Sequence, residues 1–453
     1  MSQPMSSHTT AAFPSWRRLV RGPTLEESDC KDEHRNEECR TSNPIDEAVS
    51  LVSHSEVVAD RHTSATTTLF DDMDLHENLL RGIYAHGFET PSRVQQDAIP
   101  PIVQGCNVIL QSSSGTGKSF AYIIGMLQRI DVDKDRRLQA LVLVPTRELA
   151  LQIGSNVAHI GEFVNNTAPA ENFVQVFVGG LSVSADAKKL KSGCVIVIGT
   201  LGRIADLMKR GALQTQALRV VVIDEADNLL LFRLPEELHQ LFSRRQQNSQ
   251  ELQFVLSSTT ISTATLEKAR KFVTDPIRIL VPRRNLSPEG IKQFFVSVDE
   301  ENKLLTLCDL YESITIAQTV IFTNTSCKAE WIAEQLNTFN CTASMMHADM
   351  QQSERDAVMS AFRAGCSRVL VTTDMFARGL DIVHVIIVVN YDLPTSGKDP
   401  AYVHRIGRCG RYGRKGITIN FVSPEDVALH KEIEEHWGIV IDELPMDFPA
   451  YLA

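Results

Sequence analysis

Residues 108–119 read VILQSSSGTGKS, a short apolar run that leads into serines and glycines and ends in Lys118 and Ser119. The apolar stretch FAYIIGML follows at 120–127. A strand, a glycine-containing loop and a helix in this order predict a phosphate-binding loop. A Gly/Ser-rich surface loop is the alternative, because the general pattern has glycine where Ser112 stands.

The physical reason for this pattern lies in the backbone of the loop. Glycines let N–H groups turn inward around phosphate oxygens, and the helix N-terminus adds the positive end of its dipole. We expect the Lys118 ammonium to reach the β and γ phosphates and the Ser119 hydroxyl to bind Mg²⁺. The nucleotide-contacting residues predicted in this loop are Ser112, Ser113, Ser114, Gly115, Thr116, Gly117, Lys118 and Ser119.

Short β-branched apolar runs recur along the chain, separated by helix-length amphipathic segments. The first series is ALVLV at 140–144, CVIVI at 194–198, RVVVI at 219–223 and FVL at 254–256. A second series is TVIF at 319–322, RVLV at 368–371, VIIVV at 385–389 and ITINFV at 417–422. This rhythm is typical of parallel sheets covered by helices, so we predict an α/β fold with two similar lobes.

The chain divides at changes in composition. Its 453 residues exceed the ~250 to 300 at which a single core stops growing, which favours two domains. The stretch VPRRNLSPEG breaks the strand rhythm, as an interdomain linker would. We predict a disordered polar extension at 1–65, lobe one at 66–282, a linker at 283–290 and lobe two at 291–453.

Charge and composition exclude several protein classes. No apolar run approaches the ~18 residues that span a bilayer, and the first twenty residues lack a signal-peptide pattern. We therefore expect no membrane association and a cytosolic or nuclear location. Nine cysteines without a C-x-x-C pair indicate no zinc site. The net charge of −11 argues against bulk attraction to nucleic acid, so any such contact must be local.

Asp224, Glu225 and Asp227 directly follow the run RVVVI, at the carboxyl end of a predicted buried strand. Open parallel sheets place their ligands at this edge. We expect Asp224 to hold the Mg²⁺ shell and Glu225 to orient and deprotonate the attacking water. An acidic helix N-terminus is the alternative, and the preceding phosphate loop argues against it.

Together these motifs resemble those of the DEAD-box RNA helicases, from about Phe70 to the C-terminus. The segment GFETPSRVQ at 87–95 is similar to the family's adenine-reading Q motif, with Phe70 as the upstream aromatic residue. Gln95 offers an acceptor and a donor to an adenine edge, and Phe88 can lie against the ring. The resemblance implies two tandem RecA-like parallel-sheet domains with a flexible N-terminal tail, and ATP and Mg²⁺ as cofactors.

The resemblance also implies which residues bind RNA. Short motifs in both lobes are similar to the family's RNA-contacting loops, and small hydroxyls, glycine amides and arginines suit a sugar-phosphate backbone. A single RNA strand, bound with little sequence preference, is therefore the expected partner. The implied RNA-binding residues are Pro145, Thr146, Arg147, Gly180, Thr200, Gly202, Arg203, Gln352, Arg355, Thr372 and Thr373.

Lobe two supplies the remaining implied site residues. Gly379 and Asp381 lie in a loop similar to the one whose aspartate contacts the ATP ribose. The segment HRIGRCGR at 404–411 could be a solvated basic face. By resemblance to the family, Arg408 and Arg411 instead act as arginine fingers that reach the γ-phosphate when the lobes close. Ser258, Thr260 and His404 are the residues implied to couple hydrolysis to duplex opening.

Several stretches, among them TLCDLYES at 306–313 and NYDLPT at 390–395, resemble most closely the initiation factor four-A subfamily. The resemblance implies an ATP-dependent RNA helicase that unwinds short duplexes or remodels RNA–protein complexes, in translation initiation. It also implies a monomer in the cytoplasm with a scaffold protein of the initiation complex as partner. An exon-junction-like ATP-gated RNA clamp, and a nuclear or nucleolar helicase of ribosome maturation, are the alternatives.

The chain departs from the family pattern at several positions, which are Ser112, Ser119, Leu201, Thr259, Ala348 and Cys409. Ser119 keeps the metal-binding hydroxyl, so ATP binding should survive. Thr259 adds bulk to the motif that links hydrolysis to unwinding. A P-loop kinase or GTPase is disfavoured, because one nucleotide lobe would not need the second lobe or its arginines.

Overall fold

The computed structural model describes most of the chain beyond residue 68. The described residues are 69–132, 137–165, 170–231, 238–242, 252–281, 290–313, 318–339, 341–374, 385–410 and 415–445, together with Phe448 and Tyr451. The predicted extension at 1–65 and residues 283–289 of the predicted linker lie outside them. Among the described residues, no helix is long and apolar enough to cross a membrane.

Lobe one, from η2 to β7, is built on a seven-stranded sheet in the order β3-β4-β2-β5-β6-β1-β7. Its neighbouring strands pair in parallel, for example Val142 with Ile198 and with Val222. The strands are β1 (Val108–Gln111), β2 (Ala140–Val144), β3 (Val174–Phe177), β4 (Ile196–Thr200), β5 (Val220–Asp224), β6 (Gln253–Ser258) and β7 (Ile277–Leu280).

Helices cover both faces of this sheet, which explains why its central strands are continuous apolar runs. Ala140 and Val142 of β2 pack in one hydrophobic cluster, whereas Leu141 and Leu143 pack in another. The helices are η2 (Phe70–Met73), α2 (Glu77–Ala85), α3 (Arg93–Val103), α4 (Lys118–Arg129), α5 (Arg147–Ile160), α6 (Ala170–Phe173), α7 (Val183–Lys191), α8 (Leu201–Lys209), α9 (Ala226–Leu231) and α11 (Thr263–Ala269).

Lobe two, from β8 to β14, repeats the plan with the sheet order β10-β11-β9-β12-β13-β8-β14, again parallel. The strands are β8 (Ile291–Ser297), β9 (Gln318–Phe322), β10 (Ala343–Met346), β11 (Val369–Thr372), β12 (Val385–Asn390), β13 (Gly416–Val422) and β14 (Asp442–Glu443). The helices are η4 (Glu300–Asn302), α12 (Lys303–Ser313), α13 (Ser326–Thr338), α14 (Gln352–Arg363), α15 (Ala401–Ile406) and α16 (Val427–Trp437).

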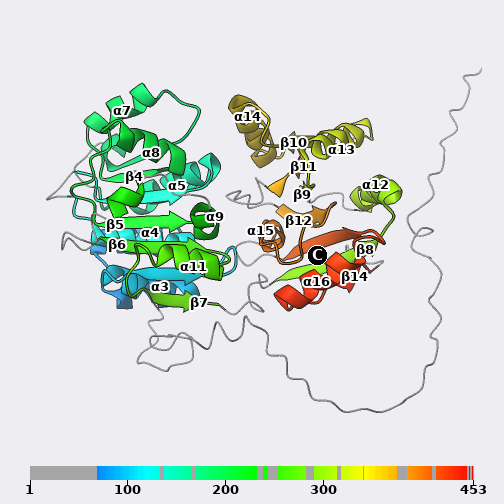
Figure 1. Cartoon of the computed structure of the whole chain (residues 1–453), viewed down its shortest axis with the longest axis horizontal. Coiled ribbons are helices and arrows are strands. Elements are labelled where there is room, and N and C mark those ends of the chain that lie inside the picture. The colour runs from blue at the N-terminus through cyan, green and yellow to red at the C-terminus, as the bar shows by residue number, and fades with distance from the viewer. Residues whose placement is uncertain are drawn as a thin grey trace, which may run out of the picture.

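The two sheets confirm the predicted α/β fold of two parallel-sheet lobes. The lobes lie side by side, and the strands of lobe one point their carboxyl ends toward lobe two (Figure 1). Helix α9, which follows β5, faces α15 of lobe two across this boundary (Figure 1). The sheet edge that carries the predicted carboxylates is therefore also the edge that meets the second lobe.

Candidate active site

A cavity of about 310 Å³ opens at the carboxyl edge of the lobe-one sheet. Side chains from both lobes line it, because Arg408 comes from the segment after α15. Its lining residues are Phe88, Thr90, Pro91, Ser92, Gln95, Ser114, Gly115, Thr116, Gly117, Lys118, Ser119, Phe120, Leu149, Gln152, Asn156, Asp224, Glu225, Thr259 and Arg408. The cavity thus joins most of the predicted nucleotide residues of lobe one.

The predicted phosphate loop forms the floor of this cavity, between β1 and α4. Gly117 has a φ of 93°, and a Cβ there would lie 2.7 Å from the Gln95 amide nitrogen, so glycine is required. The Lys118 ammonium donates to the carbonyls of Ser112 and Ser113 at 2.6 and 2.7 Å. The Lys118 ammonium therefore lies at the start of α4, next to the positive end of the helix dipole. Both favour the binding of an anion such as a phosphate.

The Q-motif residues form one wall of the cavity. Ser92 caps α3, and the Gln95 side chain completes the capping box by accepting from the Ser92 N–H at 2.8 Å. The Gln95 amide also donates to the Gly117 carbonyl at 3.5 Å, which ties this wall to the phosphate loop. Phe88 lines the cavity, whereas Phe70 is fully buried behind it, with ring centroids 6.4 Å apart. Phe70 therefore supports Phe88 rather than facing the cavity.

Asp224 ends β5 and is held from two sides. Its Oδ2 accepts from the Tyr122 hydroxyl at 2.8 Å, and its Oδ1 accepts from the Glu225 N–H at 2.9 Å. Burial and the neighbouring Glu225 charge raise the pKa of Asp224 to about 6. Glu225 has a φ of 51°, a left-handed conformation that is uncommon for a residue with a side chain. Such strain is often retained at functional sites.

These side chains fit a magnesium ion. Ser119 and Asp224 both line the cavity and offer a hydroxyl and a carboxylate oxygen, the ligand types that Mg²⁺ prefers. Burial of the Asp224 carboxylate beside Glu225 is unfavourable by itself, as the raised pKa of Asp224 shows. A divalent cation at this place would offset that cost.

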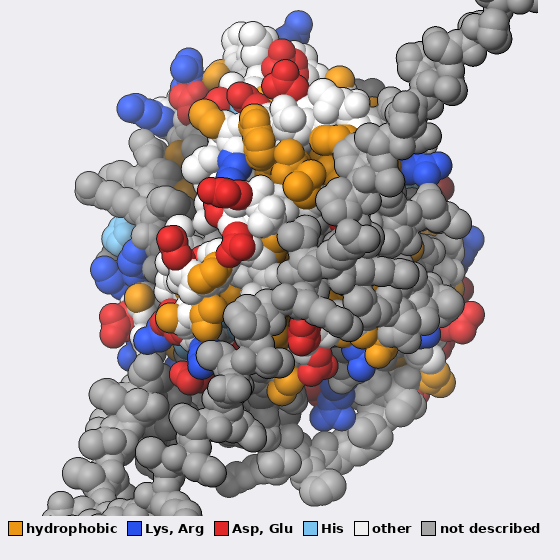
Figure 2. Space-filling model, turned by 90° about the vertical axis from the view of Figure 1, so that its right-hand side faces the viewer, with side chains coloured by type: hydrophobic (Ala, Val, Ile, Leu, Met, Phe, Trp, Pro, Cys, Tyr) orange, Lys and Arg blue, Asp and Glu red, His pale blue; other side chains and the backbone are white. Residues whose placement is uncertain are grey.

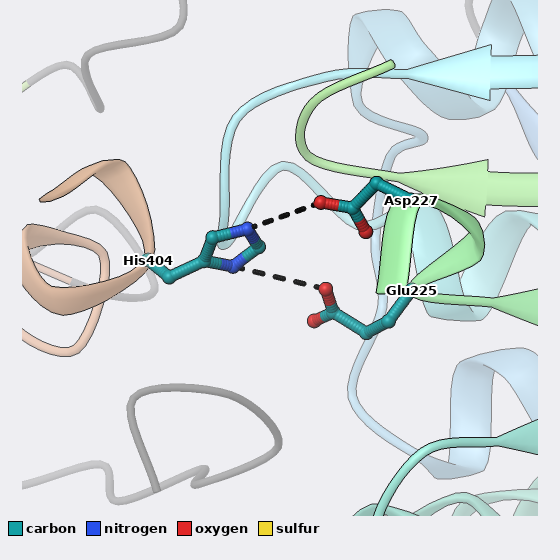
Figure 3. A group of neighbouring side chains, drawn as sticks. All are labelled: Glu225, Asp227 and His404. Atoms are coloured by element: carbon teal, nitrogen blue, oxygen red, sulfur yellow. Dashed lines mark ion pairs between the residues drawn. The ribbon is translucent and has the colours of Figure 1, made fainter. Parts of the chain in front are cut away.

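His404 of α15 lies between the two remaining carboxylates of the lobe-one motif (Figure 3). Its Nδ1 is 3.7 Å from Glu225 Oε2, and its Nε2 is 3.5 Å from Asp227 Oδ2. The imidazole is completely buried. One ring nitrogen thus faces each carboxylate, so His404 contacts both acidic side chains of lobe one from lobe two.

The predicted coupling motif is connected to this histidine. The Thr260 hydroxyl donates to Asp227 Oδ2 at 2.7 Å, and the Ser258 hydroxyl donates to the Thr260 carbonyl at 2.8 Å. Thr259 between them is buried and lines the cavity. The chain from Ser258 through Thr260 and Asp227 therefore ends at His404, across the lobe boundary.

Arg408 also contacts the site from lobe two. Its Nη2 donates to the Ser114 hydroxyl of the phosphate loop at 3.1 Å, and its Nε donates to the His404 carbonyl at 3.0 Å. The guanidinium is buried and lines the cavity. The other lobe-two residues predicted to contact the nucleotide, Gly379, Asp381 and Arg411, lie outside the described part of the chain.

In lobe one, the predicted RNA-side residues cluster beyond the ends of β2 and β4. The Arg147 guanidinium donates to the Gly179 carbonyl, next to Gly180, whose φ is 81°. Arg203 forms a buried ion pair with Asp186. Gly180 and Gly202 are exposed, while Pro145, Thr146 and Thr200 are half-buried. Arg147 and exposed glycine backbone thus lie together beyond the strand ends. Arg203 stabilises this region through its ion pair with Asp186.

In lobe two, the corresponding residues lie on α14 and at the end of β11. Gln352 donates to Asp356 at 2.8 Å and Arg355 is half-buried, both in the first turns of α14. The Thr372 hydroxyl is buried and donates to the Met346 carbonyl at 2.7 Å, so Thr373 is the more accessible of the pair. Figure 2 shows acidic and basic side chains intermixed with hydrophobic ones on the described part of the lobe-two end.

Several cavity residues carry no motif that sequence reasoning could have used. Phe120 lies 4.7 Å from Phe88 by ring centroids, and Leu149, Gln152 and Asn156 of α5 also line the cavity. Arg405 is fully buried and binds Asp374, Asn324 and Asp392 within lobe two. Phe120 directly follows the phosphate loop and Arg405 lies within the segment 404–411, so closeness to a motif is the signal that could have found them.

Two family models match the chain, and together they cover most of both lobes. Residues 92–269 match the DEAD/DEAH box helicase family, and residues 302–413 match the helicase conserved C-terminal domain. The chain belongs to the DEAD/DEAH box helicase family. It is an ATP-dependent RNA helicase, as the resemblance of its motifs predicted.

Similar proteins extend this relationship along the chain. The probable eukaryotic initiation factor 4A of Trypanosoma brucei brucei is 53% identical over 383 residues, which cover 84% of this chain and 93% of that protein. The probable eukaryotic initiation factor 4A of Trypanosoma cruzi is also 53% identical over 383 residues, which cover 84% of this chain and 93% of that protein. The predicted similarity to the initiation factor four-A subfamily is thus confirmed.

Solved structures show the same two-lobe fold. The structure of S. cerevisiae Dbp5 bound to RNA and ADP BeF3 has a TM-score of 0.76 and 34% identity, covering 85% of this chain and 100% of that chain. The structure of Mss116p bound to ssRNA and AMP-PNP has a TM-score of 0.74 and 25% identity, covering 85% and 82%. Both similarities support the tandem RecA-like fold.

Proposed function

We propose that this helicase hydrolyses ATP in a site that both lobes complete, and that it acts on RNA in translation initiation. The observation that carries the proposal is the contact across the lobe boundary. Arg408 binds the phosphate loop, and His404 lies between Glu225 and Asp227. Neither lobe contains the full set of groups, so hydrolysis requires the lobes to meet.

The roles of the lobe-one residues follow from their positions. Backbone N–H groups of residues 113–119 and the Lys118 ammonium bind the phosphates. Glu225 orients the attacking water and accepts its proton. Ser119 and Asp224 would hold Mg²⁺, and the ion would supply positive charge to the phosphates. Phe88 and Gln95 contact the adenine, which favours ATP over GTP.

The lobe-two residues act in the transition state. The Arg408 guanidinium donates a hydrogen bond to Ser114 of the phosphate loop, so it can stabilise charge that develops on the γ-phosphoryl group. Arg411, Gly379 and Asp381 remain proposed partners of the nucleotide from the same lobe. His404 contacts Asp227 and Glu225, so the surroundings of these carboxylates depend on the position of lobe two.

We propose that one RNA strand crosses both lobes through the predicted RNA-binding residues. Small hydroxyls, glycine backbone and arginine contact the sugar-phosphate backbone and read few bases. The solved relatives bound to RNA and the similarity to probable initiation factors 4A support this role. A scaffold protein of the initiation complex, a cytoplasmic location and a monomeric state belong to the same proposal.

The direct test is phosphate release with and without a single-stranded RNA. We expect RNA to stimulate turnover, because RNA and ATP both favour the closed arrangement of the lobes. Equal turnover with and without RNA would contradict an RNA-dependent helicase. RNA that is held tightly while phosphate release stays slow would favour the ATP-gated clamp instead.

A further inference from the structure

Tyr122 places a buried hydroxyl group beside the catalytic carboxylates. The proposed mechanism does not use this hydroxyl group. Tyr122 lies on α4, three residues after Ser119, so the two side chains share one face of the helix. Its ring is completely buried, yet its hydroxyl reaches Asp224 at the end of β5, 102 residues away in sequence. The tyrosine therefore joins the helix of the phosphate loop to the carboxylate strand.

The hydrogen bond fixes the orientation of the Asp224 carboxylate. Tyr122 donates to Oδ2 at 2.8 Å, while the Glu225 N–H donates to Oδ1 at 2.9 Å. With both oxygens bound, rotation of the carboxylate group would break one of the two bonds. In a residue that is 5% exposed, water cannot easily replace a lost donor.

The phenol can act only as a donor to this carboxylate. An ionised carboxylate accepts hydrogen bonds only, and a phenol carries its O–H proton at neutral pH, so the Tyr122 hydroxyl donates to Asp224 Oδ2.

We infer that Tyr122 is a positioning residue for the metal site, whose hydroxyl orders the Asp224 carboxylate before the nucleotide-bound Mg²⁺ arrives. The inference rests on the proposed role of Asp224 in binding Mg²⁺. Preorganised ligands lose less conformational freedom when the ion binds. Without the hydroxyl, more Mg²⁺ is needed to reach the same nucleotide affinity.

The test is the Tyr122→Phe variant, which keeps the ring and removes only the hydroxyl. Binding of a fluorescent non-hydrolysable ATP analogue is titrated with Mg²⁺, so no turnover is needed. We expect the half-saturating Mg²⁺ concentration to rise by about threefold to tenfold, the effect of one lost hydrogen bond. Binding of the analogue without Mg²⁺ should equal that of the unaltered protein.

Tyr402→Phe is the matched control. Tyr402 is equally buried and donates to Gln293 at 2.8 Å, within lobe two. Its loss should lower the melting temperature without changing the Mg²⁺ midpoint. An unchanged midpoint in Tyr122→Phe, or an equal rise in both variants, would overturn the inference.

An Asp224→Asn background separates the two levels of the proposal and does not depend on the stability of one variant. In that background Tyr122→Phe should have no further effect on the Mg²⁺ midpoint, because the carboxylate through which it acts is gone. A further severalfold rise would overturn the positioning role. If Asp224→Asn alone left the midpoint unchanged, the proposed metal role of Asp224 would fail instead.

Discussion

The two lobes have the same sheet order, and each has a cavity at the same edge of its sheet. The lobe-one cavity of about 310 Å³ follows β1, β5 and β6, and the lobe-two cavity of about 640 Å³ follows β8, β12 and β13. These strands occupy corresponding positions in the two sheets. The fold alone therefore provides two places for a nucleotide.

The side chains decide which place can hold a phosphate. Where lobe one has its glycine-containing loop, lobe two has Asp299, Glu300 and Glu301. Lys303 begins α12 as Lys118 begins α4, but its ammonium is 2.6 Å from Glu300 and 3.7 Å from Asp426. The charge of Lys303 is balanced by these two carboxylates, and the surrounding acidic side chains repel an anion. Of these two cavities in the described residues, the one in lobe one has the side chains that suit a phosphate.

The largest expected effect separates the two lysines. Lys118→Ala should abolish ATP binding, because the backbone loop cannot replace the ammonium at the β and γ phosphates. Lys303→Ala should leave nucleotide affinity unchanged but lower the melting temperature, because Asp426 loses its buried counter-charge and Glu300 keeps only its pair with Lys328. Titration with a fluorescent ATP analogue checks both. Equal losses of affinity in the two variants would remove the distinction between the cavities.

The next effect tests the contribution of lobe two to the lobe-one site. Arg408→Ala should slow hydrolysis by about a thousandfold, the lower range for loss of an arginine finger, with nucleotide binding retained. Arg210→Ala is the control, because Arg210 forms an exposed pair with Asp206 on the surface of lobe one. Single-turnover phosphate release measures both variants. Near-normal turnover in Arg408→Ala would show that lobe two does not enter the chemistry.

Within lobe one, Glu225→Gln should slow hydrolysis by at least about 100-fold, the usual contribution of a positioned general base. ATP and Mg²⁺ binding should persist, because Asp224 and Lys118 are intact. The variant should therefore hold RNA in the ATP-bound state. Normal binding together with normal steady-state turnover would assign water activation to another group.

A smaller effect is expected from the residue that connects the lobes without touching the phosphate loop. His404→Ala should reduce RNA stimulation of the ATPase by about tenfold, because Asp227 and Glu225 lose their contact with lobe two. ATPase activity without RNA should change less. A loss of unstimulated activity as large as that of Arg408→Ala would mean that His404 takes part in the chemistry itself.

The sequence predicted most central strands of both sheets, and it missed the edge strands and β8, an inner strand of lobe two that is only partly buried. The runs at 140–144 and 385–389 became β2 and β12, which are buried on both faces and therefore continuously apolar. Strands β3, β7, β10 and β14 have one free edge and are half-buried or exposed, so they lack that pattern. Edge strands bury fewer side chains, so their sequences show a weaker apolar pattern.

The site was predictable where chemistry restricts residue type, as in the phosphate loop and at Asp224 and Glu225. It was not predictable where a side chain acts through tertiary contact. Tyr122 is an ordinary aromatic residue of an apolar helix until the fold places its hydroxyl against Asp224. Gln95 was predicted to read adenine, and the structure adds its role in capping α3 and holding Gly117.

The measurement that tests the account most directly is the affinity for a single RNA strand in three states of the protein. These are the protein with a non-hydrolysable ATP analogue, with ADP and without nucleotide. If ATP and RNA each contact both lobes, the analogue should tighten RNA binding by a coupling of about 1 to 3 kcal/mol, and RNA should tighten analogue binding equally. ADP should give much less. Equal RNA affinities in all three states would contradict a site that ATP closes between two lobes.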